Sequence, residues 1–136
     1  MHKSLVLITA LVLFLLAAYN PGDAERARWT MGDMVSWKIS VEAYATDHGS
    51  YPDATTVEQL RDAVQPTYIR HAPMVDAWGN PYRYERTAKG FRVVSAGADG
   101  KFDATTWGTA AKQLPFDADA VVTNEGRWLV RSWELQ

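Results

Sequence analysis

Four aspartates lie in the last third of the chain, in a long stretch rich in glycine and threonine. Asp99 and Asp103 stand near the start of this stretch, and Asp117 and Asp119 close it. Hard cations such as calcium take six to eight oxygen ligands from carboxylates, backbone carbonyls and water. The stretch therefore predicts a site for a hard cation such as calcium at these four residues, and the alternative is a set of solvated turns. The alternating ligand spacing of an EF-hand does not occur here.

Other residue types that carry chemistry do not fall into working patterns. The three histidines, His2, His48 and His71, lack the spacing of a zinc site, and the sequence contains no cysteine. It also contains no G-x-S-x-G nucleophile elbow, no P-loop and no G-x-G-x-x-G. We therefore predict no catalytic residue and expect that the protein is not an enzyme.

Length and composition indicate one globular domain. The chain has 136 residues, of which 47% are apolar and 12% aromatic. Its 14 basic and 16 acidic residues give a net charge of −2 and a pI near 5.9. A nucleic-acid-binding domain is usually basic, so we expect no nucleic-acid partner.

An apolar block stands at the N-terminus. Residues 5–18 are apolar except Thr9, and Pro21-Gly22 follows shortly afterwards. A secretory signal peptide has a basic start, an apolar core and small residues before its cleavage site, and Gly22-x-Ala24 fits the last requirement. A membrane-spanning helix needs about 20 apolar residues, although a shorter one can anchor in a thinned bilayer. Residues 1–24 are therefore a signal peptide or an N-terminal membrane anchor through residues 5–19, and 25–136 form the domain.

The first half of the domain reads as helical. Between Glu25 and about Asp47, apolar residues recur every three or four positions, and Gly49 is suited to end the helix. Three further apolar residues, Trp29, Val35 and Ile39, widen this stripe. A second helix is expected from Thr55 or Thr56 to Val64, with Thr55-x-x-Glu58 as its capping box.

The second half of the domain reads as strands. Residues 82–86 and 91–95 form a hairpin around a turn at 87–90, and a long loop follows from 96 to 116. A final hairpin pairs 120–123 with 127–133. Helices followed by strands indicate an α+β fold, in which a long N-terminal helix packs on a small antiparallel meander sheet.

Four motifs in this order resemble the major pseudopilins of type II secretion systems. The most specific is Asp76-Ala77-Trp78-Gly79-Asn80-Pro81-Tyr82-Arg83-Tyr84, which is similar to the family signature D-x-W-G-N-P-Y-x-Y. The others are residues 43–52 at the end of the long helix, 95–100 at the start of the long loop, and 124–128 in the final hairpin. Asp76 is expected to cap the turn of its motif through its carboxylate.

The resemblance implies a pilin-like fold and a structural role in a type II secretion or pilus-like envelope system. Family pseudopilins bind calcium at the loop after the second strand, which implies that Asp99 is a ligand and that Asp117-Ala118-Asp119 closes the site. The expected partners are other pseudopilin-like subunits or secretion-system proteins. Residues 104–116 depart from the family loop, and the chain lacks the Gly-Phe site that prepilin peptidase cuts.

Export follows from the N-terminal block and from the resemblance. The domain is expected in the periplasm or outside the cell, or anchored in the bacterial inner membrane and facing the periplasm. The alternative function is a soluble exported binding module that uses the pilin-like fold without assembling into a filament.

Overall fold

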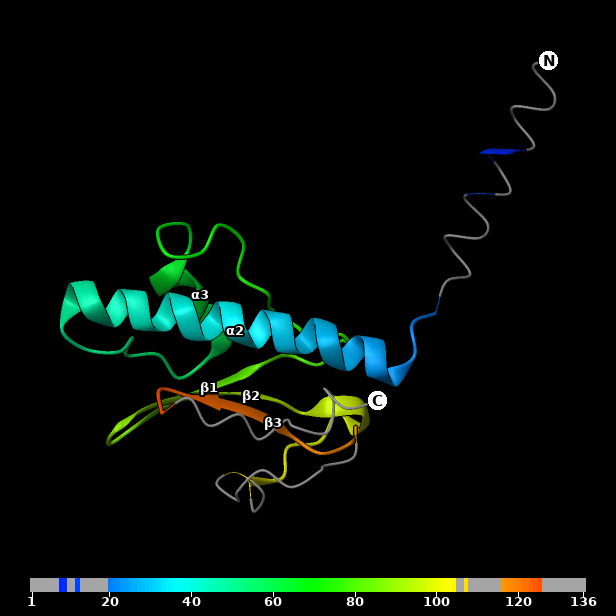
Figure 1. The fold of residues 1–136 in the computed structure, drawn as a ribbon. Coiled ribbons are helices and arrows are strands. Elements are labelled where there is room, and N and C mark those ends of the chain that lie inside the picture. Colours follow the sequence, from blue (N-terminus) through cyan, green and yellow to red (C-terminus); the bar gives the residue numbers. More distant parts are fainter. Residues whose placement is uncertain (1–7, 10–11, 13–19, 105–106, 108–115, 126–136) are drawn as a thin grey trace.

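The fold is a long helix and a short helix packed on one face of a three-stranded antiparallel sheet (Figure 1). The computed structural model describes residues 8–9, 12, 20–104, 107 and 116–125. In chain order the elements are α2 (Asp23–His48), α3 (Val57–Val64), β1 (Arg83–Thr87), β2 (Gly90–Ser95), the 3₁₀ turn η1 (Gly97–Asp99) and β3 (Ala120–Thr123). This arrangement confirms the predicted α+β class.

The long helix α2 forms where its apolar periodicity predicts it, and it begins two residues earlier than expected. It ends at Gly49, whose φ of 75° is left-handed and whose N–H donates to the Ala45 carbonyl at 2.8 Å. The residues of the predicted stripe face the sheet, with Met34 and Trp37 fully buried. Trp29 and Ile39, which were expected to widen the buried face, are 49% and 60% exposed.

The short helix α3 is capped one residue later than predicted. The Thr56 side chain accepts a hydrogen bond from the Gln59 N–H at 3.2 Å, and Gln59 Oε1 accepts one from the Thr55 N–H at 2.9 Å. The expected capping box of Thr55 and Glu58 is therefore wrong. The sequence offers Thr-Thr and Glu-Gln side by side, so the same spacing occurs twice and the pattern cannot distinguish them.

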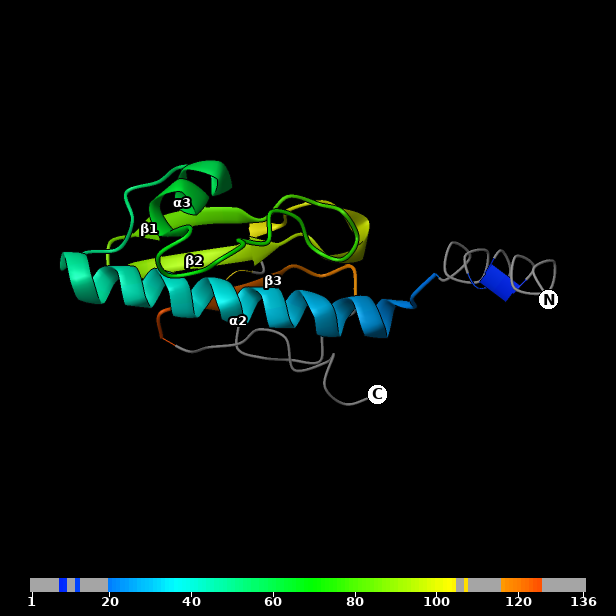
Figure 2. The ribbon, with the colours of Figure 1, turned by 90° about the horizontal axis from the view of Figure 1, so that it is seen from above.

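The sheet has the order β1-β2-β3. The pairs Thr87↔Gly90 and Arg83↔Val94 fix the first hairpin, and Val94↔Val121 fixes the pairing of β3 with β2. The strand predicted at 127–133 lies outside the described residues. Viewed from above, α2 runs along the sheet with α3 beside it (Figure 2).

The main core lies between the two helices and the sheet. It is built from side chains of α2, α3 and alternate positions of the three strands. Its fully or nearly fully buried members are Ala27, Met34, Trp37, Val41, Ala54, Val57, Leu60, Val64, Tyr82, Tyr84, Phe91, Val93, Ala120 and Val122. A second, smaller cluster lies on the opposite face of the sheet. It consists of Val94 and Val121, and Trp107 packs against both.

Candidate metal-binding loop

The loop after β2 is held close to the segment that leads into β3. Gly97 has a φ of 70°, and a Cβ at this position would meet the backbone oxygens of Ala118 and Phe116 at 2.6 and 2.7 Å. The Ala98 N–H donates to the Phe116 carbonyl at 2.8 Å. Only glycine fits this combination of positive φ and close backbone approach. The Ser-Ala-Gly-Ala-Asp-Gly segment thus folds so that the two ends of the long loop meet.

Asp119 is the buried carboxylate of this loop. Its side chain is only 3% exposed, and its Oδ2 atom accepts hydrogen bonds from the Asp103 N–H at 2.7 Å and from the Trp107 indole N–H at 2.5 Å. Its Oδ1 atom is also buried but has no hydrogen-bond partner. Burying a carboxylate oxygen without a partner is costly, so this atom fits a ligand of a bound cation.

Burial raises the pKa of Asp119, because desolvation disfavours the charged form. The hydrogen bonds from Trp107 and from the Asp103 backbone oppose this shift. The negative charges of Asp99 and Asp103 raise the pKa further. Three of the four predicted carboxylates therefore interact electrostatically, and a cation among them would relieve their repulsion.

The other predicted ligands lie in more exposed positions. Asp99 Oδ1 accepts a hydrogen bond from the Lys101 N–H at 2.9 Å, while Asp103 and Asp117 are both exposed. Within the described ranges, no three acidic or histidine side chains lie close enough together to hold one ion. The loop thus offers one buried anchor and peripheral carboxylates, and further oxygens would have to come from the backbone or water.

Asp76 organises the turn before β1, as the sequence predicts. Its Oδ1 atom accepts from the N–H groups of Trp78 and Asn80 at 3.0 and 2.9 Å. Its Oδ2 atom also accepts from the Ser95 hydroxyl at 2.7 Å. The hydrogen bond to Ser95 connects the turn to the end of β2. No local motif could have predicted it, because Asp76 and Ser95 are far apart in sequence.

Trp107 is a residue whose role the sequence does not disclose. As one of six tryptophans it is expected either to fill the core or to form an exposed contact. In the structure it is half-buried, packs on Val94 and Val121, and donates its indole N–H to Asp119. Finding this bond requires knowing that β3 pairs with β2, because that pairing places Asp119 beside the loop.

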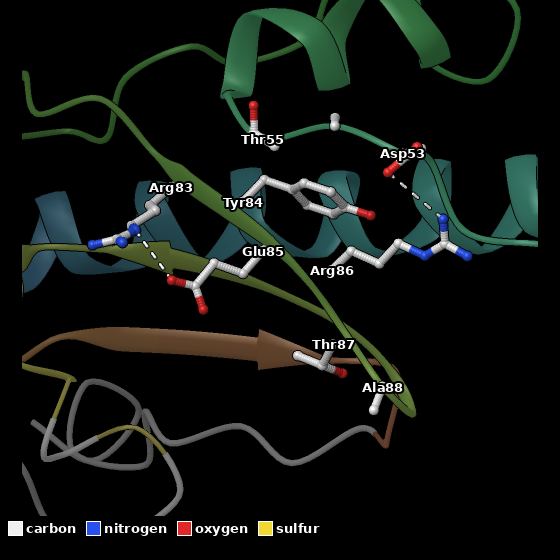
Figure 3. A pocket seen from close by; sticks show the side chains of 9 residues that line it. Asp53, Thr55, Arg83, Tyr84, Glu85, Arg86, Thr87 and Ala88 are labelled. Carbon is white, nitrogen blue, oxygen red and sulfur yellow. Dashed lines mark ion pairs between the residues drawn. The ribbon is translucent and has the colours of Figure 1, made fainter.

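A polar groove of about 670 Å³ lies along β1 (Figure 3). It is bordered by Asp53–Thr55 on one side and by the β1 side chains on the other. Arg86 reaches across to Asp53 at 3.8 Å, and Arg83 pairs with Glu85 at 3.2 Å. Burial raises the pKa of Tyr84 to about 12, so its hydroxyl stays protonated and donates to the Pro52 carbonyl at 2.9 Å. These contacts are structural and place no activated nucleophile in the groove.

A long helix across a three-stranded antiparallel sheet, with a loop closed on its own backbone, defines a pilin-like α+β domain. The family model of the type II secretion system (T2SS), protein G, matches residues 18–112, which is well over half of the chain. The chain therefore belongs to this family of major pseudopilins, whose members are structural and non-catalytic. No curated protein matches the chain at a significant level.

The family also defines the cellular context. Its members are associated with the cell envelope and interact with other components of type II secretion. Among the residues with described positions, no helix is both long enough and apolar enough to cross a bilayer.

Proposed function

We propose that this chain is a structural subunit that assembles with other pseudopilin-like subunits, with its domain on the periplasmic side of the inner membrane. The family match over residues 18–112 carries this proposal. It is supported by α2, which leaves Trp29, Val35 and Ile39 exposed on the side away from the sheet. Val35 and Ile39 are one helical turn apart and so lie side by side, and adjacent exposed apolar residues are typical of surfaces that contact another protein.

The lack of cysteine makes this proposal testable by cross-linking in the cell envelope. Ile39→Cys places a thiol on the exposed side of α2, and Asp53→Cys places a matched thiol on a 94% exposed side chain near β1. We expect disulfide-linked dimers from Ile39→Cys and fewer from Asp53→Cys. Monomers from both variants, at native expression, would contradict assembly through α2.

The alternative is a soluble exported binding module, which the Pro21-Gly22 break before α2 favours. N-terminal sequencing of the exported protein distinguishes the two functions. A start at Glu25 would favour the soluble module, and a retained N-terminal block would favour the anchored subunit. Retention is supported by Asp23, which lies in the first turn of α2 and accepts a hydrogen bond from the Trp78 indole at 2.9 Å.

We further propose that the loop binds calcium, with Asp119 as its buried ligand, backbone carbonyls and water as further ligands, and Asp99, Asp103 and Asp117 as negative charges of the same loop that attract the ion. The unpartnered Oδ1 atom of Asp119 supports this proposal. Bound calcium would cancel the repulsion among the carboxylates and stabilise the folded state by mass action.

Calorimetric titration of the full-length protein in detergent with calcium chloride tests this site. We expect saturable binding to the wild type, strongly weakened binding to Asp119→Asn, and wild-type binding to Asp53→Asn, which removes an exposed carboxylate from the groove. No heat of binding in the wild type, or equal binding by Asp119→Asn, would remove the site from this loop.

A further inference from the structure

We propose that Trp107 is a positioning residue that holds the Asp119 carboxylate for a cation and thereby couples cation binding to the covering of the outer face of the sheet. The outer face is defined as the side of the sheet opposite α2, which carries Val94 and Val121. The inference rests on the proposed calcium site and assigns a role there to a residue of the segment in which this chain departs from its family.

The two carboxylate oxygens of Asp119 differ in their hydrogen-bond partners. Oδ2 receives both hydrogen bonds, from the Trp107 indole and from the Asp103 backbone, and Oδ1 receives none. Two donors hold Oδ2 in place and so restrict the orientation of the carboxylate, and the second oxygen is left available as a ligand. Because the indole can only donate, it cannot compete with the carboxylate for a cation.

The Trp107 indole also packs on the outer face of the sheet. Val94 is fully buried and Val121 is 2% exposed, and Trp107 packs against both. Phe102 meets the indole edge-on with ring centroids 6.3 Å apart. One side chain therefore both covers the outer face and orders the proposed ligand.

Two arginines hold the indole in its orientation. The guanidinium carbons of Arg83 and Arg92 lie 5.4 and 4.8 Å from the ring centroid, within the range of cation–π attraction. Glu85 forms ion pairs with both arginines and so fixes them on the sheet surface. With the ring held on β1 and β2, its N–H direction is set by the sheet and not by the loop alone.

Cation binding at Asp119 and the packing of the Trp107 indole are coupled, because each favours the same orientation of the carboxylate. The indole N–H holds the Asp119 carboxylate in the orientation that binds the cation, and by linkage a cation on the other oxygen holds the carboxylate where the indole can donate to it. Calcium should therefore tighten the contact of Trp107 with Val94 and Val121. Loss of the indole N–H should weaken calcium binding even though Trp107 is not itself a ligand.

The test compares Trp107→Phe with the wild type and with Trp29→Phe as a matched control on the exposed side of α2. The Phe variant keeps an aromatic ring on the outer face but lacks the N–H. In calorimetric titrations of the full-length protein with calcium chloride, we expect Trp107→Phe to bind about tenfold more weakly or worse, the usual result of losing a hydrogen bond that orients a ligand. Trp29→Phe should bind like the wild type.

A second readout is the fluorine NMR signal of 5-fluorotryptophan at position 107, assigned by its disappearance in Trp107→Phe. We expect this signal to shift on adding calcium and the Trp29 signal to stay in place. Calcium binding by the wild type with equal affinity in Trp107→Phe would overturn the coupling and leave the calcium site intact. No binding by the wild type would overturn both, and a Trp107 signal unmoved by bound calcium would overturn the coupling alone.

Discussion

The two faces of the sheet are covered in different ways. The inner face packs against α2 and α3 through large apolar side chains such as Trp37, Phe91 and Leu60, which are no more than 1% exposed. The outer face buries a small apolar cluster of Val94 and Val121. Trp107 covers this cluster, and the half-exposed ion pairs of Glu85 with Arg83 and Arg92 lie beside the indole.

The difference shows that one sheet can depend on two kinds of stabilisation. Apolar burial contributes about 25 cal/mol per Å² and is nearly indifferent to dilute ions. Ion pairs near the surface contribute about 0–1 kcal/mol and weaken with salt. The inner face should therefore set the overall stability, and the outer face should respond to cations and ionic strength.

The largest effect is expected in the inner core. Trp37→Ala would empty the site of a fully buried side chain and remove its hydrogen bond to the Pro73 carbonyl, which is 2.9 Å long. We expect a loss of about 3–5 kcal/mol in the free energy of unfolding, measured by urea denaturation. Trp29→Ala, on the exposed side of α2, should cost about 1 kcal/mol or less. Similar losses from both would contradict the assignment of stability to the inner face.

Gly97→Ala should strain the loop after β2, at the point where it meets the backbone of Phe116 and Ala118. Its φ of 70° and the backbone oxygens 2.6 and 2.7 Å from a new Cβ leave no room for a side chain. We expect a destabilisation of about 2–3 kcal/mol from the conformational strain and the clash. Gly32→Ala, in open space on α2, should instead stabilise by about 0.5–1 kcal/mol. Equal melting temperatures of the two variants would show that the loop is not closed as described.

The pH dependence of the free energy of unfolding should report on Asp33, an acidic group beside the inner core. Burial raises the pKa of Asp33, the Tyr82 hydroxyl at 3.1 Å opposes the shift, and the charge of Asp76 adds to it. Because the unfolded state then loses its proton first, the free energy of unfolding should fall as pH rises from the ordinary carboxyl pKa through the raised one. Urea unfolding at several pH values should show this fall. Asp33→Asn should reduce it, and the remaining fall belongs to Asp119, whose pKa burial also raises. An unchanged slope in the variant would assign the dependence to another group.

The smallest effect is expected from the ion pairs of the outer face. Glu85→Gln weakens contacts with both Arg83 and Arg92. We expect a loss of about 0.5–1 kcal/mol at low ionic strength, and a smaller one in about 1 M salt, where charges are screened within about 3 Å. Thermal melts at the two salt concentrations would measure it. A loss that does not change with salt would mean that packing, and not charge, holds Glu85.

Most of the fold could be predicted from the sequence because its signals are local. The apolar spacing of α2, the Gly49 stop and the turn before Gly90 each specify structure over a few residues. The cap of α3 was misplaced by one residue because Thr55 and Thr56 offer equivalent side chains. The exposure of Ile39 could not be read from the sequence, because it depends on how wide a strip of the helix the sheet covers.

The candidate site was predictable only in part. The spacing of the aspartates indicates a region, but it does not reveal that Asp119 is buried while Asp117 is exposed. That distinction comes from tertiary contacts: Asp119 lies directly before β3, where the Asp103 backbone and the Trp107 indole bond to its carboxylate, whereas Asp117 lies two residues farther from the strand. The contact of Trp107 with Asp119 has the same origin, since it joins residues on either side of a loop.

The most direct test of the account is hydrogen–deuterium exchange of the full-length protein in detergent, with calcium and with chelator. We expect calcium to slow exchange at the amides of residues 98–103 and 116–121 and to leave residues 31–41 of α2 unchanged. Unchanged exchange in the loop, or equal slowing in the loop and in α2, would contradict the claim that the outer side of this pseudopilin depends on a cation and the inner side does not.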